Sequence, residues 1–119
     1  MRAVVLESYG GPEVLTIRDV PDPVPGPEEV LVQVHSTALN RADLMQRMGF
    51  YPGPNMEHEI PGMEFAGKVV AVGDRVTERA VGDEVMGIVG GGAYAEKLAS
   101  PENRVFAMPA SLDFVTAAG

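Results

Sequence analysis

The chain has 119 residues, which suits one domain and leaves no room for a second one of ordinary size. Its net charge is −8 and its nine basic residues form no stripe, which excludes a nucleic-acid partner. The absence of cysteine excludes disulfides and thiolate metal ligands, and no apolar run approaches the roughly 18 residues of a membrane span. We therefore expect a soluble, cytoplasmic protein with no membrane partner.

Short strands are predicted for the first part of the chain, because 14 glycines and 10 prolines favour turns over long regular elements. Residues 1–8 are rich in strand-forming side chains and end at a Gly-Gly-Pro turn. Residues 14–20 form the second expected strand. Four prolines within residues 21–27 then indicate a rigid, extended connector that cannot belong to a central strand.

Residues 29–37 have the clearest strand periodicity in the chain. Val30, Val32 and Val34 alternate with Leu31, Gln33 and His35, which predicts one apolar and one more polar face. On this pattern His35 is interpreted as an ordinary surface or half-buried histidine and not as a ligand.

The one internal helix is expected at residues 40–48. Asn40 is a favourable N-cap, and Asp43 follows three residues later, close in form to a capping box. The apolar side would comprise Leu44, Met45 and Met48. Gly49 is expected to end the helix, and a proline-containing loop follows.

After this loop, further strands are predicted at residues 65–72, 84–89, 94–98 and 104–107. The tail, residues 111–119, is predicted to begin a helix with Ser111 as its N-cap. A chain dominated by strands with one short internal helix indicates a mainly β fold, a small and partly open β-barrel.

Five segments in order resemble the quinone oxidoreductases related to zeta-crystallin, within the medium-chain dehydrogenase/reductase superfamily. They are residues 10–15 (GGPEVL), 38–47 (ALNRADLMQR), 61–67 (PGMEFAG), 82–85 (GDEV) and 91–96 (GGAYAE). The second segment, with Gly49 and Tyr51-Pro52 after it, is most similar to the p53-inducible branch. The resemblance implies that residues 1–119 form a GroES-like barrel, the catalytic domain on the substrate side.

Complete members of this family continue into a Rossmann domain that binds NADPH, and we expect the chain to stop before that domain. A dinucleotide fingerprint needs glycines at i, i+2 and i+5 at the start of a helix. Gly90 and Gly92 satisfy the first two positions, but Ala95 occupies the third and strand-like sequence follows. Residues 90–92 are therefore interpreted as a tight turn and not as a phosphate cradle.

A zinc-free site is expected from the residue types at the positions where many relatives bind catalytic zinc. The resemblance places Asn40 where those relatives have cysteine, and Met63 where they have the histidine of a Gly-His-Glu motif. Neither an amide nor a thioether is a usual zinc ligand. His58 with Glu57 and Glu59 lacks the second histidine of a metalloprotease motif, so no metal is predicted there.

The expected site surrounds the internal helix. Asn40 is predicted to face the nicotinamide as a catalytic and cofactor-binding residue, and its role as a plain N-cap is equally compatible with the pattern. Tyr51 is expected to stack on a quinone and donate a hydrogen bond to it, although a Tyr-Pro pair in a loop also suits packing. The remaining expected contacts are Asp43 and Met45 with the cofactor, and Met63 and Glu64 with the substrate. Asp43 alternatively serves only as a capping partner.

The predicted activity is hydride transfer from NADPH to a small-molecule quinone without zinc, in a protein that also contains the Rossmann domain as a partner for this one. Two alternatives stay open from the residues. The same scaffold serves reductases of activated alkenes, such as enals and enoyl thioesters. The chain by itself could instead be a catalytically silent β-barrel module whose exposed apolar face leads to homo-oligomers.

Overall fold

The computed structural model describes residues 1–50 and 59–119, and the strands in this part of the chain account for most of its regular structure. The strands are β1 (Arg2–Leu6), β2 (Leu15–Asp19), β3 (Glu29–Ala38), β4 (Glu64–Val72), β5 (Glu84–Ile88), β6 (Lys97–Pro101) and β7 (Val105–Ala107). The helices are α1 (Arg41–Arg47) and α2 (Phe114–Ala118), with short 3-10 turns at Pro12–Val14 and Glu102–Arg104. The predicted mainly β class is confirmed.

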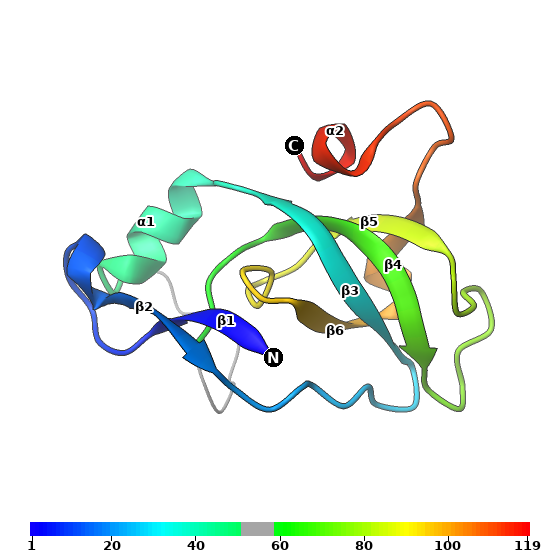
Figure 1. Ribbon diagram of the computed structural model, residues 1–119, viewed down its shortest axis with the longest axis horizontal. Coiled ribbons are helices and arrows are strands. Elements are labelled where there is room, and N and C mark those ends of the chain that lie inside the picture. Colours follow the sequence, from blue (N-terminus) through cyan, green and yellow to red (C-terminus); the bar gives the residue numbers. More distant parts are fainter. Residues whose placement is uncertain (51–58) are drawn as a thin grey trace.

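The strands form two antiparallel sheets that do not close on themselves in the described residues. Five strands are ordered β6-β3-β4-β5-β7, and β1 pairs with β2 in a separate hairpin. Figure 1 shows α1 beside this hairpin at one end of the molecule, while α2 lies over the ends of β3, β4 and β5. The prediction of a partly open β structure is therefore confirmed, with β6 and β7 as the edges of the larger sheet.

The core forms where the apolar residues of β3 and β4 meet. Val30, Val32 and Phe65 have no exposed surface, in agreement with the alternation predicted for residues 29–37. At Gly67 the two backbones approach so closely that an added Cβ would clash with the Gln33 carbonyl oxygen. This close pairing fixes the register of β3 on β4. The candidate site lies where this pairing ends, at Ala38 and Glu64.

Residues 94–96 precede β6, so the strand predicted at residues 94–98 begins three residues too early. The Val4 N–H donates to the Tyr94 carbonyl at 2.9 Å, and Ala95 forms a bridge with Ala3 on β1. The Glu96 carbonyl already accepts from the Val34 N–H of β3 at 2.9 Å, and the ladder with β3 continues from Lys97 as β6. One extended segment thus passes from the small sheet to the large one, and sequence periodicity does not change at such a crossing.

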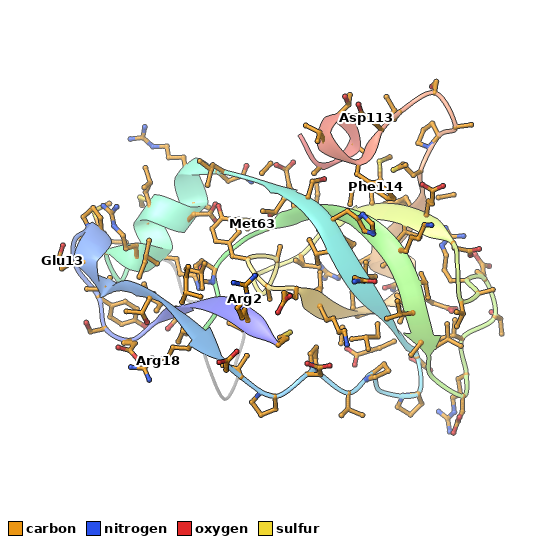
Figure 2. The ribbon with its side chains drawn as sticks, viewed as in Figure 1. Arg2, Glu13, Arg18, Met63, Asp113 and Phe114 are labelled. Carbon is orange, nitrogen blue, oxygen red and sulfur yellow. The ribbon has the colours of Figure 1, made fainter. Side chains whose placement is uncertain are left out.

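The C-terminal helix begins later than predicted, and Ser111 is not its N-cap. Asp113 caps α2, with its carboxylate accepting a 2.7 Å hydrogen bond from the Thr116 N–H. A carboxylate three residues before a free backbone N–H is a better placed acceptor than the Ser111 hydroxyl, which lies in the preceding turn. Figure 2 labels Asp113 and Phe114 at this helix start. Neither helix of the described chain is long and apolar enough to cross a membrane.

Candidate functional site

The site is built at the junction between the end of β3 and the start of α1. Asn40 has the extended backbone of an N-cap, and its N–H donates to Oδ2 of Asp43 at 2.9 Å. The capping arrangement predicted for these two residues is therefore confirmed. Because the helix starts from a defined strand end, the Asn40 side chain is carried by a rigid piece of backbone.

Glu64 orients the Asn40 side chain. The amide Nδ2 of Asn40 donates to Oε2 of Glu64 at 3.0 Å. Glu64 is the first residue of β4 and lies opposite Ala38 in the β3–β4 register, where the Thr37 hydroxyl also donates to its carbonyl at 2.6 Å. The strand register thus brings the two side chains together. It leaves one N–H of the Asn40 amide available for a ligand, while the amide oxygen faces the Asp43 backbone N–H in the capping box.

Tyr94 joins this cluster, although its sequence position did not suggest it. Its hydroxyl donates a short hydrogen bond to Oδ2 of Asp43, the same oxygen that accepts from the Asn40 N–H. The Ala38 carbonyl is also near, at 3.4 Å from the hydroxyl oxygen. Tyr94 lies 51 residues after Asp43, so only the placement of the two sheets reveals the contact.

Burial is the main reason that the pKa of Tyr94 lies well above the ordinary value of 10.0. The hydrogen bond to Asp43 raises this pKa further, as do the negative charges of Asp43 and Glu64. The phenol therefore keeps its proton at neutral pH and acts as a hydrogen-bond donor to the carboxylate.

Asp43 is unusually buried for an aspartate, with 8% of its surface exposed. Its Oδ2 has two donors, whereas its buried Oδ1 has no hydrogen-bond partner in the described part of the molecule. A buried carboxylate oxygen without a donor is unfavourable. It is available to a donor from outside this set of residues.

A mainly apolar cavity of about 360 Å³ lies against this cluster. Its lining comprises Leu15, Leu39, Asn40, Arg41, Asp43, Leu44, Arg47, Pro61 and Tyr94. A neighbouring hollow of about 470 Å³ shares Leu15, Leu39 and Tyr94 with it. A larger hollow of about 680 Å³ borders residues 90–92 but includes none of the residues predicted for the site. We place the candidate site in the cavity of about 360 Å³, because the polar side chains of Asn40, Asp43 and Tyr94 converge there.

Three of the predicted site residues, Asn40, Asp43 and Glu64, lie together in this cluster. Met45 is on α1 and partly exposed, and Met63 lies on the segment leading into β4 (Figure 2). Neither methionine lines the cavity. Tyr51 lies outside the described residues, as do Glu57 and His58.

The segment 90–92 is a turn, as predicted, whose end is held by backbone hydrogen bonds. The Gly92 N–H donates to the Ile60 carbonyl at 2.7 Å, and the Ala93 N–H to the Gly62 carbonyl at 3.1 Å. These two groups are already used and do not form a phosphate cradle. Within residues 1–50 and 59–119, no three histidine, aspartate or glutamate side chains gather as a metal-ligand set.

Comparison with known proteins places this arrangement in a family. Residues 26–110 match the alcohol dehydrogenase GroES-like domain. The chain belongs to this family. It is 41% identical to a quinone oxidoreductase of Pseudomonas aeruginosa over 98% of its length, and 39% identical to the synaptic vesicle membrane protein VAT-1 homolog of Rattus norvegicus over 99%.

The structure of this GroES-like domain also matches solved structures of the family. The Escherichia coli quinone oxidoreductase complexed with NADPH superposes with a TM-score of 0.92, at 29% identity over 99% of the chain. The chain spans 36% of that protein, 36% of the Pseudomonas relative and 30% of the rat one. The predicted resemblance to quinone oxidoreductases is confirmed for this one domain.

Proposed function

We propose that the chain is the substrate-side domain of an NADPH-dependent quinone oxidoreductase that works without zinc. The observation that carries the proposal is the apolar cavity with Asn40, Asp43 and Tyr94 in its lining. Its walls suit a planar apolar ring, and the free N–H of the Asn40 amide suits a carbonyl oxygen on that ring. The named quinone oxidoreductases among its relatives support the same activity.

The nucleotide part of NADPH would be held by a following Rossmann domain, which the greater length of the relatives supports. The side chains that line the cavity are proposed to contact the nicotinamide end. Asn40 and Asp43 line the cavity, and we propose that both lie near the nicotinamide, with Met45 beside them on α1. Tyr51, Met63 and Glu64 are proposed for the substrate side. A cytoplasmic location is proposed as well.

Reduction of a quinone consumes one hydride and one proton and yields a hydroquinone. NADPH supplies the hydride when it is bound. The amide of Asn40, held by Glu64, is proposed to donate a hydrogen bond to the quinone oxygen that becomes negative, and the apolar walls exclude water. The proton comes from solvent. A zinc ion is not required, because the product anion is a stabilised phenolate, and Asn40 and Met63 stand at positions where zinc-binding relatives have ligands.

A chimera tests this proposal directly. Residues 1–119 would replace the matched segment of the Pseudomonas aeruginosa quinone oxidoreductase, whose remaining part supplies the nucleotide-binding domain. We expect the chimera to oxidise NADPH with menadione and to show no activity with acrolein, an activated alkene. The 119-residue chain alone should show no saturable NADPH binding at micromolar concentration.

The Asn40→Ala chimera is the matched variant, and its turnover of menadione should fall by roughly 100-fold, the usual effect of removing one oxyanion donor. A folded chimera that binds NADPH and reduces acrolein but not menadione would overturn the quinone proposal. Saturable binding of NADPH by the chain alone would contradict the assignment of the nucleotide to another domain.

A further inference from the structure

We propose that Tyr94 is a positioning residue for the site, which holds Asp43, and through it Asn40, in one orientation toward the cavity. The inference deepens the proposed function and rests on it for its catalytic consequence. Its structural part, the link from Tyr94 to Asn40, can be tested without any turnover.

The backbone of Tyr94 is fixed on two sides. Its N–H donates to the Pro61 carbonyl at 3.0 Å, and its carbonyl accepts from the Val4 N–H at 2.9 Å. Tyr94 is thereby attached both to β1 and to the segment that leads into β4. Such an anchored residue can hold another group in place, because its own position does not depend on that group.

The ring of Tyr94 lies directly on Gly62. This glycine has a φ of +105°, and a Cβ added to it would stand 2.6 Å from both the Tyr94 ring and the Tyr94 nitrogen. Only glycine tolerates this conformation and this approach without strain. Tyr94 also packs against the buried cluster of Ala3, Val5, Val20 and Ile60. The ring therefore has little freedom to turn.

The Tyr94 hydroxyl makes the contact that holds Asp43. A phenylalanine would fill the same space, yet the hydroxyl donates to Oδ2 of the buried Asp43 carboxylate. Hydrogen bonds to charged groups are about twice as strong as neutral ones. With the Asn40 N–H on the same oxygen, the carboxylate is held from two directions, and within residues 1–50 and 59–119 its Oδ1 has no partner.

Asp43 links Tyr94 to Asn40 at the start of α1, because its Oδ2 accepts hydrogen bonds from both residues. If the Tyr94 hydroxyl is removed, the Asn40 N–H is the one donor that the described residues still offer to the Asp43 carboxylate, which gains freedom to rotate. The Asn40 backbone then loses a fixed capping partner, and its amide loses a fixed position relative to Glu64. Displacement of a site group by about 1 Å can reduce turnover by roughly 100-fold.

Nuclear magnetic resonance of the 119-residue chain tests the link. Tyr94→Phe should shift the backbone N–H of Asn40 and the signals of its side-chain amide. Tyr9→Phe is the matched control, because the Tyr9 hydroxyl also donates to a carboxylate, Glu59, at 3.0 Å but lines no part of the cavity. This control should leave the Asn40 signals in place. Unchanged Asn40 signals in Tyr94→Phe would overturn the proposal.

A second measurement uses the wild-type tyrosine and remains informative if Tyr94→Phe folds poorly. The ionisation of Tyr94, followed by the carbon resonance of its phenol, should move to lower pH in Asp43→Asn. Asp83→Asn, which changes a carboxylate outside the site, should leave it unchanged. Ionisation of Tyr94 at the same pH in Asp43→Asn and wild type would show that Asp43 is not its partner.

Kinetics of the chimera tests the catalytic consequence. Tyr94→Phe should lower kcat by roughly 10- to 100-fold with little change in the KM for NADPH. In the Asp43→Asn background the same substitution should have no further effect, because its influence passes through Asp43. Additive losses would overturn the positioning role. An inactive wild-type chimera with the expected resonance shifts would instead refute the proposed function and leave the structural link intact.

Discussion

Asn40 serves both the fold, as the N-cap of α1, and the candidate site, through the N–H groups of its side-chain amide. The backbone N–H is bound by Asp43 within the helix start, while the amide is bound by Glu64 from the neighbouring strand. Because the two contacts use different atoms, the capping role does not compete with the proposed catalytic one. The two interpretations that the sequence left open for Asn40 are therefore compatible in one geometry.

The phenol of Tyr94 should make the stability of the chain depend on alkaline pH. Its pKa is raised in the folded chain, by burial first and then by Asp43 and Glu64, so the folded state holds the proton more tightly than the unfolded state. The resulting stabilisation is complete below the ordinary pKa of 10.0 and is lost as the pH rises through the folded pKa. Urea denaturation at increasing pH should show the free energy of unfolding falling above about pH 10.

Tyr94→Phe is the comparison for this pH dependence, because it removes the ionisable hydroxyl and keeps the ring. Its free energy of unfolding should fall less steeply over the same alkaline range. An equal slope in the variant and the wild type would assign the effect to other groups. Tyr9 is the first of these to consider, since the pKa of this exposed tyrosine is also raised, chiefly by its hydrogen bond to Glu59.

Part of the site could be predicted from the sequence because part of it is local. Asn40 and Asp43 are three residues apart, and the spacing of a capping box is readable in any sequence. Glu64 was predicted as a site residue only through family resemblance, and its contact with Asn40 depends on the β3–β4 register. Tyr94 was predicted only as part of a strand. It was not predicted as a site residue, because no local pattern connects a residue after a glycine turn with a distant helix.

At the scale of elements, α2 is held to the sheet by a few contacts that can be tested one at a time. It has five residues, and its single cap is the Asp113 carboxylate. It is held to the sheet by a stack between Phe114 and His35 on β3, with ring centres 4.3 Å apart, and by a hydrogen bond from the Ser36 hydroxyl to the Phe114 carbonyl. An isolated helix this short would not be stable in water.

Removal of the cap should loosen α2 while the sheet stays folded. Asp113→Ala should speed amide hydrogen exchange at Thr116 and Ala117 and leave exchange in β3 and β4 unchanged. Asp113→Asn is the matched control, because asparagine is also a good N-cap, and it should stay close to the wild type. Equal exchange in Asp113→Ala and wild type would show that the stack on His35 is sufficient to hold the helix.

The strands were predictable to the extent that one face of each is buried. The alternation of residues 29–37 gave β3 nearly to the residue, because Val30 and Val32 both point into the core. The start of β6 was not predictable, because residues 94 and 95 are paired with β1 instead of β3. Periodicity reports that a residue is extended and does not report its partner.

At the scale of the whole molecule, apolar side chains are exposed around the two hollows that share Leu15, Leu39 and Tyr94. Leu39 is 87% exposed although it lies beside the proposed active centre. Such a surface favours association, which the charge of −8 opposes by repulsion between copies. The balance between these two effects decides whether the 119-residue chain is monomeric.

Salt should shift this balance toward self-association, because it screens the charges and leaves the apolar attraction intact. Light scattering of the chain should show the average mass rising with salt and with protein concentration. Leu39→Ser should keep the chain monomeric over the same range. Val81→Ser is the control, since Val81 is 64% exposed but lines neither hollow. A monomer under all conditions would contradict this expectation.

Oδ2 of Asp43 is a meeting point for residues 40, 43 and 94, and this has a consequence for how the sequence can vary. Residue 40 contributes a backbone N–H, which every residue except proline supplies, so it is the choices at residues 43 and 94 that depend on each other through this atom. Random libraries that vary residues 43 and 94 one at a time should therefore find few acceptable replacements at either position. Libraries that vary these two together should recover working pairs that no series of single steps reaches.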